Sequence, residues 1–281
     1  SSDLGGGKAL VNAYFRSAEA LGARIDYDAE AVGIELDGDR FAAAHVRHKL
    51  PGGGFRDERI TAKACVLACG GFESNREWLR EAWGVNQYGE HPADNFLIRG
   101  TRFNTGTVIA NLRDQGADMI GDATQAHMVA IDARAPLYDG GICTRIDCVS
   151  LGVVVNREAR RFYDEGEDFW PKRYAIWGRL VAQQPGQIGY SIIDSKAVGR
   201  FMPPVFPGVQ AHTLPALAEQ LGLPVDTFMQ TLNDFDQACR EGHFDHTRLD
   251  DCHTEGVTPA KTHWARRIDT GPFYAYPVRP G

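Results

Sequence analysis

A glycine pair, Gly70-Gly71, is the first place in the chain where the residue types suit ligand chemistry. It follows a short apolar run, residues 64–68, and precedes a helix signal in which Ser74 and Glu77 have the spacing of a capping box. A glycine lets backbone N–H groups approach a ligand closely, and the start of a helix favours negative charge. The pattern therefore predicts a backbone contact to an anionic ligand, with a plain strand-to-helix turn as the alternative.

Two side chains further along, Arg173 and His127, could bind an acid. The planar fork of an arginine binds a carboxylate bidentately. A histidine can donate a hydrogen bond to a carboxylate or a carbonyl. Each residue also has an ordinary interpretation, as a surface arginine and a structural histidine.

Other chemistries have no support in the sequence. There is no GxGxxG motif behind a strand, no Walker loop, no HExxH and no GxSxG. None of the six cysteines forms a CxxC pair. Cys143 with Cys148 is the one pairing that could hold a metal, and we predict no metal site. Cys65 and Cys69 are expected to be small core residues.

The elements that would position these residues begin with an α/β portion, up to about residue 80. It contains a helix over residues 10–21 and strands at residues 24–27, 31–36, 41–48, 55–61 and 64–68. Asp37-Gly38 is a hairpin signal. Because residues 64–68 are continuously apolar, they are expected to form a strand buried on both faces in a parallel sheet.

The chain changes character at about residue 81, where loops lengthen and aromatic residues are scattered through polar sequence. This part is expected to be α+β. Its expected elements are a short helix through Val108 and Leu112, strands at residues 151–156 and 188–193, and a helix through Phe228 and Phe235.

Composition excludes several classes of function. The chain has 281 residues, 43% of them hydrophobic, and a formal net charge of -7. Nucleic acid is not expected as a partner, because phosphate binding needs clustered positive charge. No run of about 18 apolar residues occurs, so no membrane span is predicted. The cysteine usage favours the reducing cytoplasm.

Five segments, in order, resemble the flavoprotein subunits of the fumarate reductase and succinate dehydrogenase superfamily. Residues 66–72, which read V-L-A-C-G-G-F, are similar to a strand that ends in A-T-G-G-F in that superfamily. The other four are the glycine-rich entry to a helix at residues 5–10, the turn Thr105-Gly106-Thr107 (T-G-D-G in the superfamily), residues 125–127 (Q-A-H-P-T), and residues 155–162 (V-N-x-E-G-x-R-F).

Residues 161–175 most resemble tricarballylate dehydrogenases, and flavoproteins labelled precorrin-3B synthase are related to them. The resemblance implies part of a glutathione-reductase-type FAD-binding domain with an inserted capping domain. Residues 1–80 would belong to the FAD-binding domain, residues 81–272 to the capping, substrate-binding domain, and residues 273–281 to the start of the return. The GxGxxG loop would then precede residue 1, and the last catalytic segment would follow Gly281.

The resemblance also assigns roles to individual residues. Arg173 would exchange a proton with the substrate, although an arginine hardly deprotonates unless a second cation is near. His127 would hold a substrate carboxylate or carbonyl, and Arg99 and Arg102 would supply further cations. The backbone contacts to FAD would come from Val32, Cys69, Gly70, Gly71, Thr105 and Gly106.

Two departures from the superfamily pattern favour a dehydrogenase over a fumarate reductase. The Glu-x-x-Arg proton relay of fumarate reductases is replaced by Arg145-Ile146-Asp147-Cys148. Thr107 replaces an aspartate near the flavin.

The favoured hypothesis is an FAD-dependent dehydrogenase that oxidises a small polycarboxylate, tricarballylate to cis-aconitate. It would pass electrons to a membrane-bound partner, so that its location is cytoplasmic or peripheral to the inner membrane through that partner. A related flavoprotein acting on a corrinoid precursor, fumarate or a ketosteroid is the second hypothesis. The third is that these residues are an inert module in isolation.

Overall fold

The computed structural model describes residues 6–139 and 144–281, which fall into two compact units. Unit 1 consists of the chain up to Gly70 together with Gly106–Met119, and unit 2 consists of Gly71–Thr105 and Ile120–Gly281. The chain therefore passes from one unit to the other inside the glycine pair and again between Thr105 and Gly106. The domain boundaries inferred from the resemblance stay a prediction.

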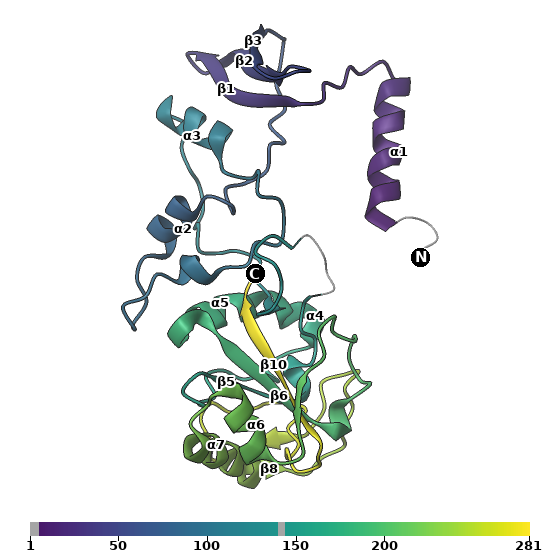
Figure 1. Ribbon diagram of the computed structural model, residues 1–281, viewed down its shortest axis with the longest axis vertical. Helices are drawn as coiled ribbons and strands as arrows, with labels where there is room; N and C mark the ends of the chain where they lie inside the picture. The colour runs from purple at the N-terminus through teal and green to yellow at the C-terminus, as the bar shows by residue number, and fades with distance from the viewer. Residues whose placement is uncertain (1–5, 140–143) are drawn as a thin grey trace. The chain divides into compact units, whose positions relative to one another are not determined.

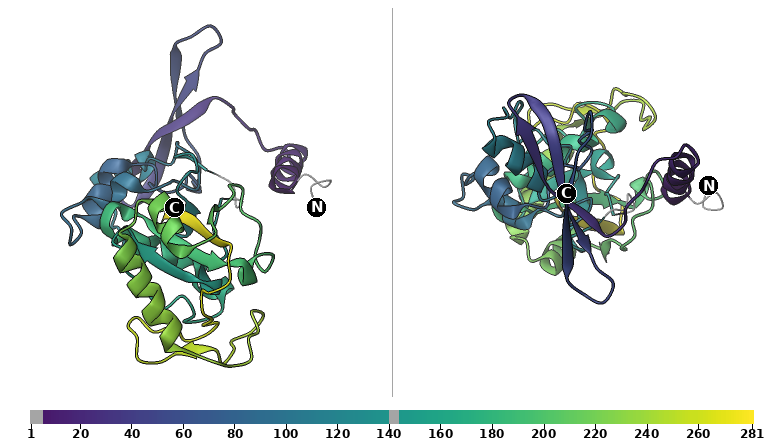
Figure 2. Two further views of the ribbon diagram at one scale, coloured as in Figure 1. Left: turned by 60° about the horizontal axis from the view of Figure 1, so that its bottom comes forward. Right: turned by 90° about the horizontal axis from the view of Figure 1, so that it is seen from above.

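Unit 1 is built on a three-stranded antiparallel sheet with the strand order β1-β2-β3 (Figures 1 and 2). The hairpin predicted from Asp37-Gly38 is confirmed, and Gly38 adopts a positive φ of 57° in it. The elements of this unit are α1 (Gly6–Ala20), β1 (Ala29–Asp37), β2 (Arg40–Lys49), β3 (Phe55–Ile60) and α3 (Thr107–Asp114).

Helix α3 attaches to the edge strand β1 through two side-chain amides one helical turn apart. The Oδ1 of Asn111 accepts a hydrogen bond from the backbone N–H of Ile34 at 2.6 Å, and Nε2 of Gln115 donates to the carbonyl of Ile34 at 2.6 Å. Gln115 also accepts from the N–H of Leu36 at 3.1 Å. Residues four apart share a helix face, so both amides reach β1 together. The edge strand thereby gains partners for exposed backbone groups.

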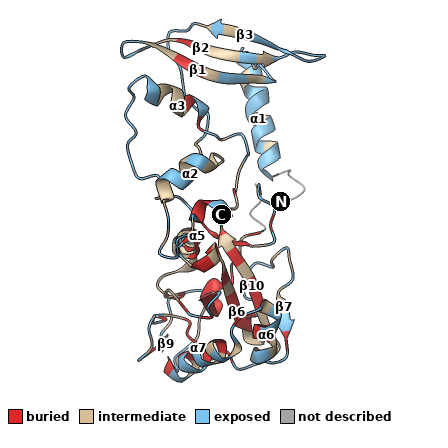
Figure 3. Ribbon diagram, turned by 60° about the vertical axis from the view of Figure 1, so that its left-hand side comes forward, coloured by how far each residue is buried: buried red, intermediate tan, exposed pale blue. Residues whose placement is uncertain are grey.

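Helix α1 forms as its periodicity predicts, but none of its residues is buried (Figure 3). Leu10 is 54% exposed and Tyr14 is 66% exposed.

Unit 2 contains a five-stranded antiparallel sheet with the order β4-β10-β6-β5, and β7 also pairs with β10. Its strands are β4 (Ala130–Asp132), β5 (Val153–Asn156), β6 (Gly189–Asp194), β7 (Val209–Ala211) and β10 (Phe273–Pro280), with β8 (Cys239–Arg240) and β9 (His253–Thr254) in a separate two-stranded ladder. Its helices are α2 (Arg76–Trp83), α4 (Trp170–Arg173), α5 (Trp177–Ala182), α6 (Leu214–Leu221) and α7 (Val225–Ala238), with short 3-10 helices at Pro92–Asn95, Val149–Leu151, Tyr174–Ile176, Pro185–Gln187 and Ser195–Ala197.

Helices cover both faces of this sheet. Phe228 and Phe235 of α7 pack with Val153 and Val155 of β5 in one core cluster. Residue 154, between those two valines, points to the opposite face, where it packs in a second cluster with Trp177 of α5. Successive residues of a strand alternate between faces, so a strand covered on both sides is apolar throughout. This explains why residues 153–155 are all valine.

The mixed α and β content predicted from the sequence is confirmed. The predicted parallel sheet is wrong for the described residues, because every strand ladder in them is antiparallel. Residues 64–68 form no strand, and Val66 is 90% exposed. A strand buried on both faces needs pairing neighbours, and no described strand pairs with this run. Cys65 and Cys69 are therefore exposed rather than core residues.

Two further local predictions are corrected by the structure. Residues 24–27 form no strand. The cap of α2 is Asn75, whose Oδ1 accepts from the N–H of Trp78 at 3.1 Å, rather than Ser74. Ser74 instead donates through its hydroxyl to the carbonyl of Thr101 at 2.7 Å. The helix starts one residue later because asparagine is an equally good N-cap and Ser74 has another acceptor.

Candidate functional site

Arg173 lies at the end of the short helix α4, where two polar side chains hold its guanidinium. Its Nη2 donates to the hydroxyl of Tyr163 at 3.2 Å and forms an ion pair with the carboxylate of Glu167. The Arg173 side chain is about one-third exposed. Burial, together with the hydrogen bond to Glu167, raises the pKa of Tyr163 above its ordinary value. Tyr163, Glu167 and Arg173 therefore form one hydrogen-bonded cluster at the surface of a cavity.

That cavity, which we call the arginine cavity, has a volume of about 390 Å³. Arg173 lines it together with Arg179 of α5, and Arg179 donates through its guanidinium to Oε1 of Gln125. Two guanidinium groups around one cavity suit an anionic ligand, because each can bind a carboxylate through two parallel hydrogen bonds. Arg179 is thus a second cation that lines the same cavity as Arg173. Sequence reasoning missed Arg179, since nothing in its neighbours distinguishes it from a surface arginine.

His127 contacts Tyr174, the residue that follows Arg173 in the chain. Its ring meets that of Tyr174 edge to face, with centroids 5.3 Å apart. The imidazole lines a separate cavity of about 280 Å³, which we call the histidine cavity, together with Arg99 and Glu73. Apolar side chains form much of the rest of its wall, namely Leu79, Trp83, Phe96, Leu97, Ile98 and Met128. Trp83 lines both cavities.

The four predicted substrate-contacting residues are therefore brought together only in part. Arg99 and His127 line the histidine cavity, and Arg173 lines the arginine cavity beside it. Arg102 lines neither of these cavities. It is exposed, with its guanidinium 5.1 Å from the centroid of the Phe103 ring. All four lie in unit 2.

The residues at the position of the missing proton relay form a nearly buried ion pair. Arg145 donates to both carboxylate oxygens of Asp147, at 2.6 and 2.9 Å, and the indole of Trp170 donates to the same carboxylate at 2.8 Å. The Arg145 guanidinium also lies over the ring of Tyr174, 4.6 Å from its centroid. These contacts anchor Trp170, the first residue of α4, and Tyr174, the residue that follows α4. Arg145 and Asp147 therefore position the Arg173 segment and do not line either cavity.

The motif at residues 155–162 builds the scaffold rather than the cavities. Ala159, at the position of the motif's glycine, is fully buried with a φ of 59°. Arg161 forms two hydrogen bonds with Glu165, at 3.0 and 2.6 Å, and the two side chains are 3% and 0% exposed. The fully buried Lys261 donates to the carbonyls of Ser150 and Gly152, and burial lowers its pKa to about 8.

The predicted cofactor contacts divide between the two units. Unit 1 holds Val32, Cys69, Gly70 and Gly106, and unit 2 holds Gly71 and Thr105. Val32 lies at a register shift in β1, between Ala31 and Gly33. Gly70 and Gly106 have φ values of 75° and 77°, a conformation that favours glycine. Gly106 also precedes α3 directly, and no side chain caps that helix there.

In unit 2, the carbonyl of Thr105 accepts from Nδ2 of Asn75 at 3.0 Å. A Cβ at Gly71 would approach the Glu73 carboxylate to 2.9 Å.

Metal chemistry finds no support among the described residues, where no three His, Cys, Asp or Glu side chains cluster as metal ligands. Cys143, one half of the alternative metal pair, lies outside the described residues, as does Gly5 of the glycine-rich helix entry. Cys148 is buried, and burial raises the pKa of its thiol to about 12. Within the described ranges, no helix has both the length and the apolar character needed to cross a bilayer.

Comparison with known proteins places this chain beside flavoenzymes. No family model matches it. It is 24% identical to a 3-oxosteroid 1-dehydrogenase of Mycolicibacterium smegmatis, over 99% of this chain and 51% of that protein. It is 23% identical to a 4-oxocyclohex-2-ene-1-carboxylate 5-dehydrogenase of Sinomonas cyclohexanicum, over 98% and 49%. The chain thus spans about half the length of the curated relatives it matches.

Solved structures give the same picture. A flavocytochrome c3 fumarate reductase in its open conformation aligns with a TM-score of 0.63 over 97% of this chain and 44% of that one, at 19% identity. A 3-ketosteroid delta1-dehydrogenase from Sterolibacterium denitrificans aligns with a TM-score of 0.65 over 94% and 50%, at 18% identity. At these identities the likeness shows the fold.

The proteins to which this chain is similar have the enzyme class and the cofactor that the sequence predicts. They are dehydrogenases and a reductase, and FAD is the flavin of these relatives. The superfamily predicted from the sequence is the one to which they point. The narrower resemblance to tricarballylate dehydrogenases stays a prediction.

Proposed function

We propose that this chain belongs to an FAD-dependent dehydrogenase that forms a carbon–carbon double bond beside a carboxylate or carbonyl group. The observation that carries the proposal is the pair of guanidinium groups, Arg173 and Arg179, lining one cavity. Similarity to dehydrogenases over almost the whole chain supports the reaction class.

In this proposal the two arginines bind and orient the substrate carboxylate. Arg173 is held by Tyr163 and Glu167, and Arg179 by Gln125, so both guanidinium groups are fixed before the substrate arrives. Fixed donors lose less conformational entropy when a ligand binds.

Desaturation removes a proton from one carbon and a hydride from its neighbour, and FAD, when bound, accepts the hydride. Within the cluster, the carboxylate of Glu167 is the group that can hold the proton. An arginine keeps its own proton at ordinary pH, so Arg173 transfers a proton only if a partner supplies or accepts one. The ion pair with Glu167 provides that partner, replacing the relay that residues 145–148 lack.

A small polycarboxylate such as tricarballylate is the proposed substrate. Arg173 and Arg179 would bind one end, and Arg99 and His127, which line the cavity on the other side of Trp83, would bind a further carboxylate. Arg102 is proposed only as an outer cation, because its side chain is exposed.

An oxo-substituted ring is the second candidate substrate class. The wall of the histidine cavity is largely apolar, and His127 could donate to a ring carbonyl there. Two relatives are named for such substrates, a 3-oxosteroid and a 4-oxocyclohexenecarboxylate. A ring acid would use both cavities, with its carboxylate on the arginines.

The FAD contacts are proposed at Val32, Cys69, Gly70, Gly71, Thr105 and Gly106. Support comes from the left-handed conformation of Gly70 and Gly106. It also comes from the N-terminus of α3, which no side chain caps. Residues 1–80 would then belong to an FAD-binding domain, 81–272 to a capping domain and 273–281 to the start of the return. A membrane-bound electron acceptor completes the proposal.

The test is substrate-dependent bleaching of the flavin in the holoenzyme. We expect Arg173→Ala to lower the bleaching rate with the true substrate by roughly 10²-fold or more, the equivalent of losing two charge-assisted hydrogen bonds. The matched control is Lys172→Ala, which removes an adjacent cation whose side chain is 67% exposed. Equal rates in wild type and Arg173→Ala would remove Arg173 from the mechanism.

Parallel assays separate the substrate classes: bleaching of the oxidised flavin by tricarballylate or by 4-androstene-3,17-dione, and reoxidation of the reduced flavin by fumarate. Bleaching by the steroid alone would overturn the polycarboxylate proposal and keep the dehydrogenase. Mixing these 281 residues with FAD and recording the flavin spectrum tests the remaining hypothesis, that they are inert in isolation.

A further inference from the structure

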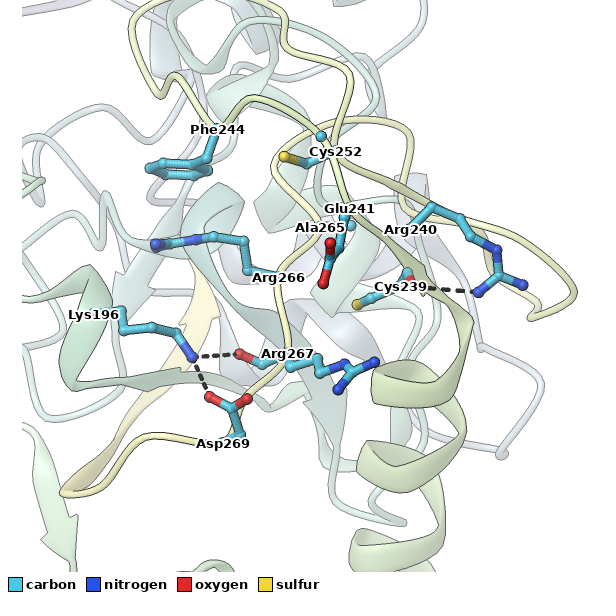
Figure 4. A pocket seen from close by; sticks show the side chains of 11 residues that line it. Lys196, Cys239, Arg240, Glu241, Phe244, Cys252, Ala265, Arg266, Arg267 and Asp269 are labelled. Atoms are coloured by element: carbon cyan, nitrogen blue, oxygen red, sulfur yellow. Dashed lines mark hydrogen bonds and ion pairs between the residues drawn. The ribbon is translucent and has the colours of Figure 1, made fainter.

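A third cavity in unit 2, of about 370 Å³, shares no lining residue with the arginine and histidine cavities (Figure 4). It lies beside the β8–β9 ladder. Four cations and two carboxylates line it: Lys196, Arg240, Arg266 and Arg267, with Glu241 and Asp269. Among the lining residues themselves, cations therefore outnumber carboxylates.

Part of that charge is already neutralised. Lys196 pairs with Asp194 at 2.7 Å and with Asp269, and Arg240 donates to Glu255 at 2.8 Å. Asp269 is therefore occupied by the lysine, as the dashed line in Figure 4 shows. Glu241 is exposed.

Arg266 is different, because its guanidinium is half-buried without a polar partner. Its central carbon lies 3.7 Å from the centroid of the Phe244 ring, and Figure 4 shows the side chain extended beneath that ring. Its Nε is buried with no hydrogen bond, and no hydrogen bond or ion pair joins the guanidinium to any residue in the described part of the chain. Burial lowers the pKa of Arg266, while Asp194 acts against that shift from a distance.

A buried donor without a hydrogen-bond partner, such as the Nε of Arg266, is costly, because buried polar groups in folded proteins are nearly always satisfied. Stacking on an aromatic face fixes the plane of a guanidinium and leaves its N–H edge available for two parallel hydrogen bonds.

We propose that this cavity is a second anion site, in which Arg266 binds a small oxyanion, a carboxylate or phosphate group, at the edge of its guanidinium. Phe244 holds the guanidinium plane, and the unpaired guanidinium of Arg266 supplies the charge that attracts the ligand. The site is independent of the dehydrogenase proposal, since it uses none of the same residues.

Two cysteines give a reporter that the other cavities lack. Cys239 and Cys252 both line this cavity, and Cys239 is half-buried. The rate of Cys239 alkylation by iodoacetamide, followed by mass spectrometry of its peptide, would be measured against phosphate and, separately, succinate at constant ionic strength. We expect saturable protection by at least one of the two anions, and their comparison distinguishes phosphate from carboxylate.

The variant Arg266→Gln should weaken the protecting anion by roughly tenfold to a hundredfold, as expected for the loss of charge-assisted hydrogen bonds. Arg266→Lys, which keeps the charge without the fork, should weaken it less. The control Arg248→Gln removes an exposed arginine paired with Asp245 and should change nothing. Absence of protection in wild type, or unchanged protection in a folded Arg266→Gln protein, would overturn the proposal.

Discussion

Glu165 is expected to hold unit 2 together, because it is the counter-ion of two buried cations. Its carboxylate accepts two hydrogen bonds from Arg161 and one, at 2.8 Å, from the N–H of Val154 in β5. Glu165 is also the main charge that favours the ammonium of Lys261, which is 1% exposed. The variant Glu165→Gln keeps the shape of the side chain and removes only its charge.

Removing one partner of a buried ion pair costs roughly 3–5 kcal/mol, because the other charge is left without compensation. The variant strands two cations, so the upper part of that range is expected. Total stabilities are about 5–15 kcal/mol, so the loss is a large fraction of the whole. It corresponds to a fall in Tm of roughly 10–20 °C for a unit of this size.

Tryptophan fluorescence in urea measures this loss selectively, because all five tryptophans of the chain lie in unit 2. The matched control is Lys172→Gln, which breaks another pair at i,i+4 spacing, with Asp168, whose side chains are 67% and 31% exposed. That pair should contribute little. The double variant Arg161→Met/Glu165→Gln should recover part of the stability. If Glu165→Gln moves the midpoint no further than Lys172→Gln, the reasoning is refuted.

Three more predictions follow from individual side chains. Burial raises the pKa of Asp236 from 3.8 to about 6, so the unfolded chain binds fewer protons between about pH 4 and 6 and stability falls as pH rises through that window. Asp236→Asn should therefore gain about 1–2 kcal/mol at pH 7.5 and nothing at pH 4, measured by urea unfolding at both. Ala159→Gly should change the free energy of unfolding by no more than about 1 kcal/mol, because relief of the left-handed φ offsets the lost methyl group. Ala159→Val should lower it by roughly 2–4 kcal/mol in the same assay. In the holoenzyme, Glu167→Gln should lower kcat by roughly 10²-fold with little change in KM, and an unchanged kcat would exclude Glu167 as the proton acceptor.

Much of the local structure could be predicted because the signals are local. The hairpin at Asp37-Gly38 follows from turn chemistry, and α7 follows from apolar residues at helical spacing, of which Phe228 and Phe235 are fully buried. Residues 151–156 and residues 64–68 are both predicted to form strands. Only the first is β-structure, because β6 pairs with it and helices cover both of its faces.

The candidate site was harder to predict, because it depends on contacts between distant segments. Arg179 and Gln125 are joined by a hydrogen bond across 54 residues, and neither belongs to a motif that specifies its partner. The resemblance points to Arg173, which precedes Tyr174, and to His127, which contacts the Tyr174 ring, but it could not show that they line different cavities. The role of Arg173 or Arg179 could be argued only after its hydrogen-bond or ion-pair partner was known.

The central strand β10 has a consequence for how this protein can be cut. Its residues, Phe273–Pro280, pair with β4, β6 and β7, three strands that come from much earlier in the chain. A fragment ending at residue 272 would lose that strand and leave unpaired backbone edges open to other molecules, a known route to aggregation. During synthesis the sheet can close only after these residues have left the ribosome, so earlier segments must wait without their partner. Any expression design for unit 2 should therefore retain residues 273–281.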